Sequence, residues 1–455
     1  MSLQSINPAT QRLLKTFAYH TDEELENILA GAAGAFHSWR QTPFAERAAL
    51  MLACAGILEN EAPRYAQTIS LEMGKPLQQA IGEVKKCAIA CRYYAEKAET
   101  FLADENINTA AAKSFISFEP MGAVLAIMPW NFPYWQVFRF AAPALMAGNV
   151  ALLKHASNVP QCALDLEDIF RRAGFPPGVF TALLVPTEKI TAIIQDDRIQ
   201  AVTLTGSEGA GSKVAEAAGR AIKKTVLELG GSDPFIILAD ADLDKAAETA
   251  VNSRMINTGQ SCIAAKRFLV EEAVADSFLA KMKALMQTKK TGDPLKDDCD
   301  FGPLARKDLA QSLQKQVRQS IEKGARIYLD GGQQDPESAY FYPMILTGIQ
   351  PGMPAYDEEL FGPVALVFVV PDAAEAIRIA NDHRYGLGAT IFTRDLVRGE
   401  QLARQIESGQ VFLNTLVQST PDMPFGGVKK SGYGRELSYL GIREFVNQKS
   451  IWIEN

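Results

Sequence analysis

A cysteine and a glutamate near the middle of the chain have the residue types and surroundings of a catalytic pair. Glu228 ends an apolar, strand-like run that breaks at Gly230 and Gly231, and Cys262 lies in a turn of small residues, GQSC, that we expect to open a helix. Exposed backbone amides and the helix dipole would stabilise a thiolate at such a position. The carboxylate is then a candidate base for a second step.

Two other interpretations of Cys262 compete with this one. Cysteine hydrolases activate the thiol with a histidine, and none of the four histidines lies in a Gly- or Cys-rich turn typical of such a dyad: His20, His37, His155 and His383. A thiol hydrolase is therefore the weaker alternative. A free cysteine is also often a small buried hydrophobe, and a non-catalytic protein could be built on the same framework. The surrounding motifs must discriminate between these classes.

Length and composition are those of a globular enzyme with more than one domain. The 455 residues, 47% of them hydrophobic, are too many for one compact core. The net charge of -7 and the lack of a Lys/Arg block give little support to a nucleic-acid or membrane partner. Six scattered cysteines do not resemble a disulfide framework, and no leader or bilayer-spanning stretch is apparent. A cytoplasmic location is the simplest expectation.

The order of strand-like and helix-like segments indicates an α/β fold. Residues 21–104 repeat apolar side chains at intervals of three and four, which predicts helices. Cys87 and Cys91 share one helical face, and we expect them in the core, because no further ligands indicate a metal site. Short apolar strands alternate with helices from 122 to 228, and the rhythm resumes after Gly231. Two doubly wound parallel sheets are predicted, with ligands at the carboxyl ends of the strands.

Several polar residues follow the predicted strands. Asn131 stands in an apolar, proline-bounded turn, where its amide needs a partner such as an oxyanion that forms in a substrate. A Gly-Ser turn at residues 206–207 separates a strand from a helix, and its backbone amides could approach a phosphate. Lys154 ends another strand and could bind a ribose or a phosphate. Each signal alone is weak, since glycine turns and single lysines are common.

Taken together, seven motifs resemble the aldehyde dehydrogenase superfamily over essentially the whole chain. They occur in the expected order: MPWNFP (128–133), LKHAS (153–157), TGS (205–207), LELGGSDP (227–234), GQSC (259–262), EELFGPV (358–364) and PFGGVKKSGYGRE (424–436). Within the superfamily, the chain is most similar to bacterial and cyanobacterial succinate-semialdehyde dehydrogenases. The resemblance implies NAD(P)-dependent oxidation of succinate semialdehyde to succinate, with another small aldehyde, such as glutarate semialdehyde, as the alternative substrate.

The resemblance also implies roles for the catalytic residues. Cys262 matches the nucleophile whose thiolate adds to the aldehyde, and the Asn131 amide and the Cys262 backbone N–H match the donors to the oxyanion. Hydride then passes to the nicotinamide and leaves a thioester. Glu228 matches the base that activates water for hydrolysis of that thioester. No metal is expected.

For the cofactor, the resemblance implies contacts to the adenosine ribose, the pyrophosphate and the nicotinamide ribose from these residues: Trp130, Lys154, Ser157, Gly206, Ser207, Glu359 and Phe361. Many NAD-preferring relatives carry a glutamate where Ser157 stands. A carboxylate there would repel a 2′-phosphate by ~4 kcal/mol at an effective dielectric of 20. Serine beside Lys154 removes that repulsion, so we expect NADP to be preferred over NAD.

For the substrate, Arg139 and Ser419 match residues that bind the distal carboxylate of a semialdehyde, although Arg139 could instead pair with a structural carboxylate. The expected cofactor-binding domain comprises residues 1–108 and 122–230, and the catalytic domain comprises 231–423. Alternating segments in 109–121 and 437–455 resemble the oligomerisation strands of the family. A homodimer or homotetramer is therefore expected. Ala264 stands where some relatives have a second cysteine, so no disulfide switch is expected at Cys262.

Overall fold

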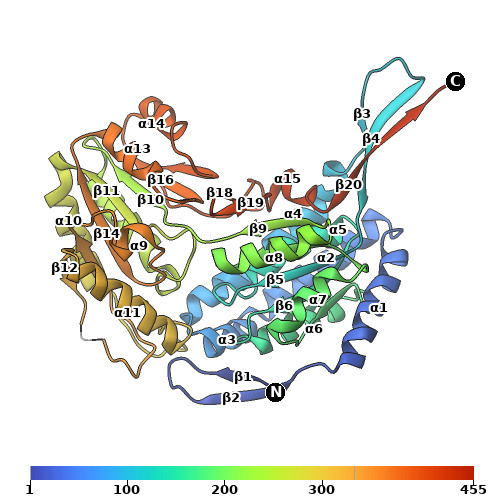
Figure 1. Ribbon diagram of the computed structural model, residues 1–455, viewed down its shortest axis with the longest axis horizontal. Coiled ribbons are helices and arrows are strands. Elements are labelled where there is room, and N and C mark those ends of the chain that lie inside the picture. The colour runs from blue at the N-terminus through green and yellow to red at the C-terminus, as the bar shows by residue number, and fades with distance from the viewer. Residues whose placement is uncertain (1, 333) are drawn as a thin grey trace.

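Two open sheets, each covered by helices on both faces, form the two lobes of the molecule (Figure 1). The computed structural model describes residues 2–332 and 334–455. The α/β fold class predicted from the sequence is confirmed. In both sheets the strand order reverses at one point, which is the hallmark of a doubly wound topology and the usual location of a ligand crevice.

The first sheet has the strand order β19-β9-β8-β5-β6-β7 and is parallel except at the short edge strand β19. Its order reverses between β5 and β8. The strands are β5 (Ala123–Met128), β6 (Val150–His155), β7 (Phe180–Ala182), β8 (Ile199–Thr205), β9 (Lys224–Glu228) and β19 (Gly432–Tyr433).

Helices from the first half of the chain enclose this sheet (Figure 1). They are α1 (Asp22–Trp39), α2 (Phe44–Asn60), α3 (Ala62–Met73), α4 (Leu77–Phe101), α5 (Trp135–Met146), α6 (Pro160–Arg172), η1 (Thr187–Lys189), α7 (Ile190–Gln195) and α8 (Glu208–Arg220). The predicted helices between residues 21 and 104 are thus confirmed. Cys87 and Cys91 lie buried in the core on α4, as expected.

The second sheet has the order β12-β13-β14-β11-β10-β16-β17, with only β12 antiparallel. Its strands are β10 (Pro234–Ile237), β11 (Arg267–Glu271), β12 (Arg326–Asp330), β13 (Met344–Thr347), β14 (Val364–Val370), β16 (Gly388–Phe392) and β17 (Gln410–Leu413). The helices of this lobe are α9 (Leu243–Met255), η2 (Ile256–Gly259), α10 (Glu272–Gln287), α11 (Lys307–Glu322), α12 (Pro354–Asp357), α13 (Ala373–Asn381) and α14 (Leu396–Ala403).

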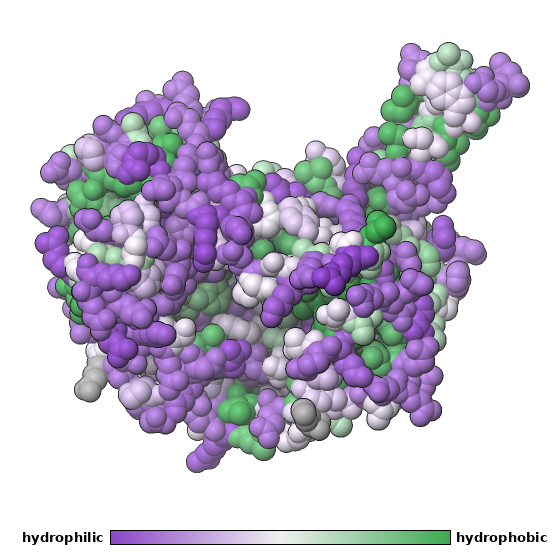
Figure 2. All heavy atoms as spheres, viewed as in Figure 1, coloured by the Kyte–Doolittle hydropathy of each residue, from purple (hydrophilic) through white to green (hydrophobic). Residues whose placement is uncertain are grey.

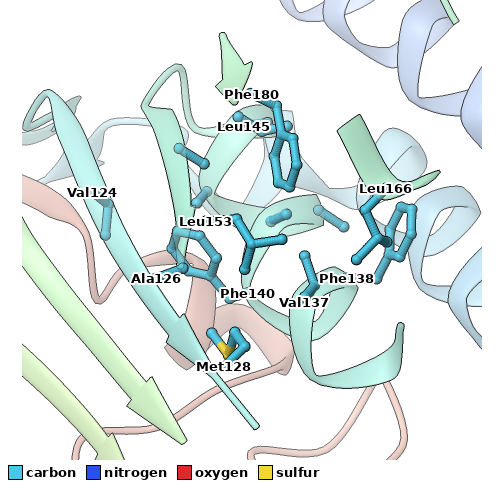
Figure 3. Packing of buried hydrophobic residues seen from close by; sticks show 14 of the residues in the cluster. Val124, Ala126, Met128, Val137, Phe138, Phe140, Leu145, Leu153, Leu166 and Phe180 are labelled. Carbon is cyan, nitrogen blue, oxygen red and sulfur yellow. The ribbon is translucent and has the colours of Figure 1, made fainter. Parts of the chain in front are cut away.

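A dense apolar core fixes the loop that follows β5. Figure 3 shows side chains of β5 and β6, such as Met128 and Leu153, converging on Val137 and Phe138 of α5. Phe138 also stacks on Phe170 of α6, with the ring centroids 5.2 Å apart. Because α5 is buried along its whole length, residues 129–134 between β5 and α5 are anchored at both ends.

An arm projects from the first lobe and carries the C-terminus (Figure 1). It consists of β3 (Glu105–Asn106), β4 (Lys113–Pro120) and β20 (Val446–Ile453). The two alternating segments pair with each other within the chain, because β20 runs antiparallel to β4 over eight residue pairs. Hydrophobic residues lie on the arm surface (Figure 2). Trp452 of β20 is 56% exposed.

The remaining elements are small. A hairpin of β1 (Ser2–Ile6) and β2 (Leu13–Ala18) lies beneath the first lobe. The returning C-terminal segment contains β18 (Val428–Lys429) and α15 (Ser438–Ile442), and β18 pairs with β15 (Tyr385–Gly386), which precedes β16. No helix in the two described ranges has the length and apolar character needed to cross a bilayer.

Candidate active site

Cys262 lies in a turn that leads into a strand, so the prediction that it opens a helix is wrong. Helix α9 is followed by η2, in which Asn257 and Thr258 have φ values of 51° and 55°. These left-handed residues end the helical path. The chain then turns at Cys262 and enters β11, whose pairing with β10 and β14 at the centre of the sheet requires an extended backbone. No helix N-terminus is therefore available to the thiol.

The buried ammonium of Lys266 holds the cysteine turn instead. Lys266 Nζ donates hydrogen bonds to the carbonyl oxygens of Ser261 at 2.9 Å, Cys262 at 2.8 Å and Ala264 at 3.2 Å, and pairs with Glu359 at 3.2 Å. The sequence interpretation missed this lysine. The pattern that could have identified it is a lysine four residues after the cysteine and directly before an apolar strand.

The Cys262 thiol is half-buried and lines a cavity, so it is accessible to a small molecule. Burial raises its pKa to about 12, while the positive charges of Arg139 and Lys266 act in the opposite direction. A thiolate at this position therefore depends on nearby cations. The backbone also crowds the turn, because a Cβ on Gly231 would lie 2.7 Å from the Cys262 carbonyl oxygen.

Asn131 lies in the loop between β5 and α5 and contacts the segment that precedes Cys262. Its Nδ2 donates to the Gln260 backbone carbonyl oxygen at 3.2 Å, and the backbone carbonyl oxygen of Asn131 accepts a hydrogen bond from Asn257 Nδ2 at 2.8 Å. The Asn131 side chain is buried. Since a side-chain amide has two N–H donors, one remains for another acceptor beside the cysteine turn.

Glu228 is the last residue of β9, and its side chain is 2% exposed. Burial raises the pKa of this carboxyl well above its usual range, and the neighbouring Glu436 raises it further. Neither carboxyl oxygen has a hydrogen-bond partner within residues 2–332 and 334–455. Gly426, at a φ of +156°, leaves room for the group, because a Cβ there would lie 2.7 Å from Glu228 Oε1. The carboxyl is thus a desolvated acid that becomes a strong base once it ionises.

A cavity of about 310 Å³ lies beside Cys262, between α4, α5 and the loop after β17. Arg139 of α5 is in its wall, but its guanidinium pairs with Glu436 and stands over the Phe425 ring at 4.3 Å. Ser419 is also in the wall and accepts hydrogen bonds from Lys86 Nζ at 3.1 Å and Trp135 Nε1 at 2.9 Å. Lys86 is a second residue that the sequence interpretation missed, because one lysine on an amphipathic helix resembles a solvated one.

The predicted cofactor residues of the first lobe follow the carboxyl ends of its strands. Trp130 follows β5, Ser157 follows β6, and Gly206 and Ser207 follow β8. Ser207 caps α8, accepting a hydrogen bond from the Ala210 amide at 3.3 Å. These positions flank the point where the strand order reverses, as a dinucleotide site requires.

Lys154, in β6, fits an anionic group. It is half-buried, burial lowers its pKa, and no carboxylate of the described residues lies within ion-pair distance of it. Ser157 also lines a surface groove that includes Arg306. Asp308 lines the same groove and pairs with Arg306, so the positive charge offered to a 2′-phosphate here comes from Lys154.

Glu359 and Phe361 come from the second lobe and precede β14. Glu359 accepts a hydrogen bond from the Gly231 amide at 3.2 Å in addition to its ion pair with Lys266. The Phe361 ring meets Trp130 edge to face, with centroids 5.8 Å apart. The two lobes thus meet beside the cysteine turn. Within the described ranges, no cluster of three or more His, Cys, Asp or Glu side chains could hold a metal ion.

Comparisons with known proteins agree with this architecture. Residues 1–451 match the model of the aldehyde dehydrogenase family. The chain is 52% identical to the probable succinate-semialdehyde dehydrogenase [NADP(+)] of Synechocystis sp. and 50% identical to succinate-semialdehyde dehydrogenase [NADP(+)] 1 of Mycobacterium tuberculosis, with both chains of each pair fully covered. The solved structure of succinic semialdehyde dehydrogenase from Streptococcus pyogenes in complex with NADP+ superimposes with a TM-score of 0.97 at 38% identity, again over both whole chains. The chain therefore belongs to the aldehyde dehydrogenase family.

Proposed function

We propose that this protein oxidises succinate semialdehyde to succinate, with NADP as the hydride acceptor. The single observation that carries the proposal is the cavity in which the Cys262 thiol shares a wall with Lys86, Arg139 and Ser419. A thiol is the nucleophile for the aldehyde group, and cationic and hydroxyl donors suit a carboxylate at the other end of a short substrate. The names of the relatives support the same substrate.

The first half of the reaction uses Cys262 and Asn131. The thiol loses its proton to water, assisted by the charges of Arg139 and Lys266, and the thiolate adds to the aldehyde carbon. The second Asn131 N–H and the Cys262 backbone N–H donate to the oxyanion that forms. Bound NADP supplies the acceptor for the hydride that leaves this carbon. A thioester on Cys262 remains.

The second half uses Glu228. Its ionised carboxylate takes a proton from water, and the resulting hydroxide attacks the thioester carbon. The bond from carbon to Sγ breaks, the acid leaves, and the proton held by Glu228 passes to the departing sulfur, so that Cys262 and Glu228 both return to their starting states. The buried position of Glu228 suits this role, since its raised pKa makes it a better proton acceptor than an exposed carboxylate.

For the cofactor, the proposed contacts are Lys154 and Ser157 with the adenosine ribose and its 2′-phosphate, and Gly206 and Ser207 with the pyrophosphate. The N-terminus of α8 and the free charge of Lys154 support this arrangement. Trp130, Glu359 and Phe361 lie beside the cysteine turn and are proposed to position the nicotinamide ribose.

A steady-state assay at 340 nm tests the function. We expect catalytic efficiency to be highest with succinate semialdehyde and NADP, lower with glutarate semialdehyde, and much lower with butanal, which has four carbons and no carboxylate. Higher efficiency with glutarate semialdehyde would favour that alternative substrate. Equal efficiency with butanal would refute a carboxylate-specific enzyme.

We also propose a cytoplasmic homodimer or homotetramer divided into the expected domains 1–108 with 122–230, 231–423, and the arm. Six free cysteines support a reducing compartment. The projecting arm supports assembly through its strands.

A further inference from the structure

The carboxylate of Glu83 holds one end of the loop that carries Asn131. Glu83 lies on α4 and is buried. Its Oε1 accepts the backbone amides of Tyr134 at 2.9 Å and Trp135 at 3.1 Å, where the loop becomes α5. The first amides of a helix have no partner within that helix, so a carboxylate from another element satisfies them here. Its negative charge also suits the positive end of the helix dipole.

Lys75 holds the other oxygen of Glu83. It lies in the turn between α3 and α4, is buried, and pairs with Glu83 Oε2. Its Nζ also stands 3.7 Å from the centroid of the Phe132 ring. A cation over an aromatic face is attracted to it, and more strongly where water is excluded. Because Phe132 directly follows Asn131, the buried pair contacts the loop at two places.

The same helix also holds the segment that precedes the cysteine turn. Gln79 accepts the backbone amide of Asn257 at 2.8 Å. Gln79 and Glu83 are four residues apart and so lie on one face of α4. Asn257 in turn donates to the Asn131 backbone carbonyl oxygen at 2.8 Å. One face of α4 therefore supports both the loop of the oxyanion donor and the segment that leads to the nucleophile.

An oxyanion donor acts only when it is accurately placed, at about 2.7–3.1 Å from the charged oxygen. A displacement of about 1 Å can cost ~10² in rate. Without Glu83, the Asn131 loop could move, while Gln79 would still hold the cysteine side. The expected defect is a misplaced amide beside an intact thiol.

We propose that Glu83, held by Lys75, is a positioning residue that places the Asn131 amide against the cysteine turn. This assignment rests on the oxyanion role of Asn131 in the proposed function. It does not depend on which aldehyde the enzyme oxidises.

Two reagents that react with Cys262 distinguish placement of the amide from damage to the thiol. The thiolate attacks the acetyl carbon of 4-nitrophenyl acetate, forms a tetrahedral oxyanion and expels 4-nitrophenolate. The same sulfur displaces iodide from iodoacetamide without forming an oxyanion. A change in thiol ionisation or in the shape of the cavity would affect both reactions, whereas a misplaced oxyanion donor slows only acylation. Stopped-flow absorbance of 4-nitrophenolate and mass spectrometry of the alkylated peptide give the two rate constants.

The main variant combines Lys75→Met with Glu83→Leu. Both charges are removed together because loss of Glu83 alone would leave a buried ammonium unpaired. We expect acylation to slow about 10- to 100-fold, less than for outright removal of an oxyanion donor, because the amide is displaced rather than deleted. Alkylation should stay within a few-fold of the wild type.

The matched control is Glu72→Leu. Glu72 is also a buried glutamate, and its two oxygens accept the backbone amides of Gln161 at 3.0 Å and Cys162 at 2.9 Å, at the start of α6. This variant loses the same kind of helix cap at a helix that does not follow the Asn131 loop. It should be less stable than the wild type and keep the wild-type ratio of acylation to alkylation.

A double-mutant cycle with Asn131→Ala tests whether Glu83 acts through Asn131. In the Asn131→Ala background, the main variant should slow acylation less than about 3-fold further, because the donor to be placed is already missing. Thermal unfolding establishes that each variant is folded. If the main variant is not folded, Glu83→Asp decides: it keeps the charge beside Lys75 but withdraws the carboxylate by one methylene, and should slow acylation about 3- to 10-fold with alkylation unchanged.

Three results would overturn the assignment: equal slowing of acylation and alkylation, wild-type acylation in the folded Glu83 variants, or the full loss repeated in the Asn131→Ala background. Wild-type acylation in Asn131→Ala alone would refute the oxyanion role of Asn131 and the assignment with it. Failure to oxidise succinate semialdehyde would instead refute the proposed substrate, and the two reagents would still decide the role of Glu83.

Discussion

At the scale of single residues, Cys262 depends on a buried ammonium for its position and for part of its acidity. Lys266 donates hydrogen bonds to three carbonyl oxygens of the cysteine turn and also pairs with Glu359. A helix N-terminus would have supplied partial positive charge through backbone amides. Here one side chain supplies a whole charge, at the cost of burying it.

The substitution Lys266→Met should therefore reduce both the reactivity of Cys262 and the stability of the protein. We expect the pH dependence of Cys262 alkylation by iodoacetamide to shift to higher pH. The free energy of unfolding should fall by about 3–5 kcal/mol, as for other broken buried ion pairs. Mass spectrometry of the labelled peptide follows alkylation across pH. Lys245→Met, an exposed lysine of α9, is the control; an unchanged pH profile in Lys266→Met would contradict the electrostatic role.

The Glu228→Gln substitution should separate the two halves of the reaction. Glutamine cannot take a proton from water, so we expect one equivalent of reduced cofactor to form in a burst and turnover to fall by ~10² to 10⁴. Stopped-flow absorbance at 340 nm measures the burst. Steady turnover at the wild-type rate would exclude Glu228 as the base. The exposed Glu216→Gln on α8 should have no effect.

At the scale of elements, the first sheet faces the site with the carboxyl ends of its strands, and the second sheet faces it with the amino ends. Candidate residues of the first lobe lie at or just after the carboxyl ends of β5, β6, β8 and β9, whereas Cys262, Glu359 and Phe361 precede β11 and β14. The rule that ligands gather at the carboxyl ends of strands therefore located the first group only. The second group was found through the resemblance of its motifs.

Much of the fold could be predicted from the sequence because its signals are local. The alternating segment within residues 109–121 forms β4, and the continuously apolar run at residues 364–370 forms β14. The turn at Cys262 was not predictable in this way. Nothing in INTGQSC signals left-handed Asn257 and Thr258, whose backbone is fixed by contacts with distant residues such as Gln79 and Gly302. The Arg139–Glu436 pair likewise joins segments almost 300 residues apart.

His155 connects the end of β6 to the loop that carries Asn131. Its Nδ1 accepts the Ala156 amide, so its Nε2 carries the proton and donates to the Pro133 carbonyl oxygen at 2.9 Å. Burial lowers the pKa of this imidazole to about 4. The folded state thus prefers neutral His155, and its contribution to stability is present above the ordinary pKa of about 6.5 and lost as pH falls towards 4.

Comparison with His155→Gln tests this linkage. Between pH 7 and pH 4 the wild type should lose on the order of 3 kcal/mol more unfolding free energy than the variant, since 1.36 kcal/mol corresponds to one pKa unit. Urea unfolding at several pH values gives the difference directly. Parallel pH dependences would show that His155 does not carry the effect. The exposed His37→Gln is the control.

At the scale of the whole molecule, the arm presents apolar side chains away from both lobes (Figure 2). Trp452 and Ile453 at its tip are 56% and 44% exposed, and β20 is an outer strand of the three-stranded arm sheet. Such an edge is a natural site for assembly with another copy.

Replacing both side chains, Trp452→Lys and Ile453→Lys, should weaken the assembly without disturbing the active-site lobes. We expect light scattering to give a smaller mass than for the wild type at equal concentration. Lys449→Ala on the same strand should keep the wild-type mass. A monomeric wild-type protein, or an unchanged mass in the double variant, would rule out the arm as the contact.

The short strand β19 has a consequence for when the enzyme becomes active during its synthesis. Its residues Gly432 and Tyr433 pair with Glu228 and Leu227 of β9, and so cover the edge of the first sheet at the proposed base. More than 200 residues, including the whole second sheet, separate the two partners. While residues 432–433 are still inside the ribosome, the edge of β9 would remain open to water. We therefore expect the proposed thioester hydrolysis to begin only after the chain has been released beyond this strand.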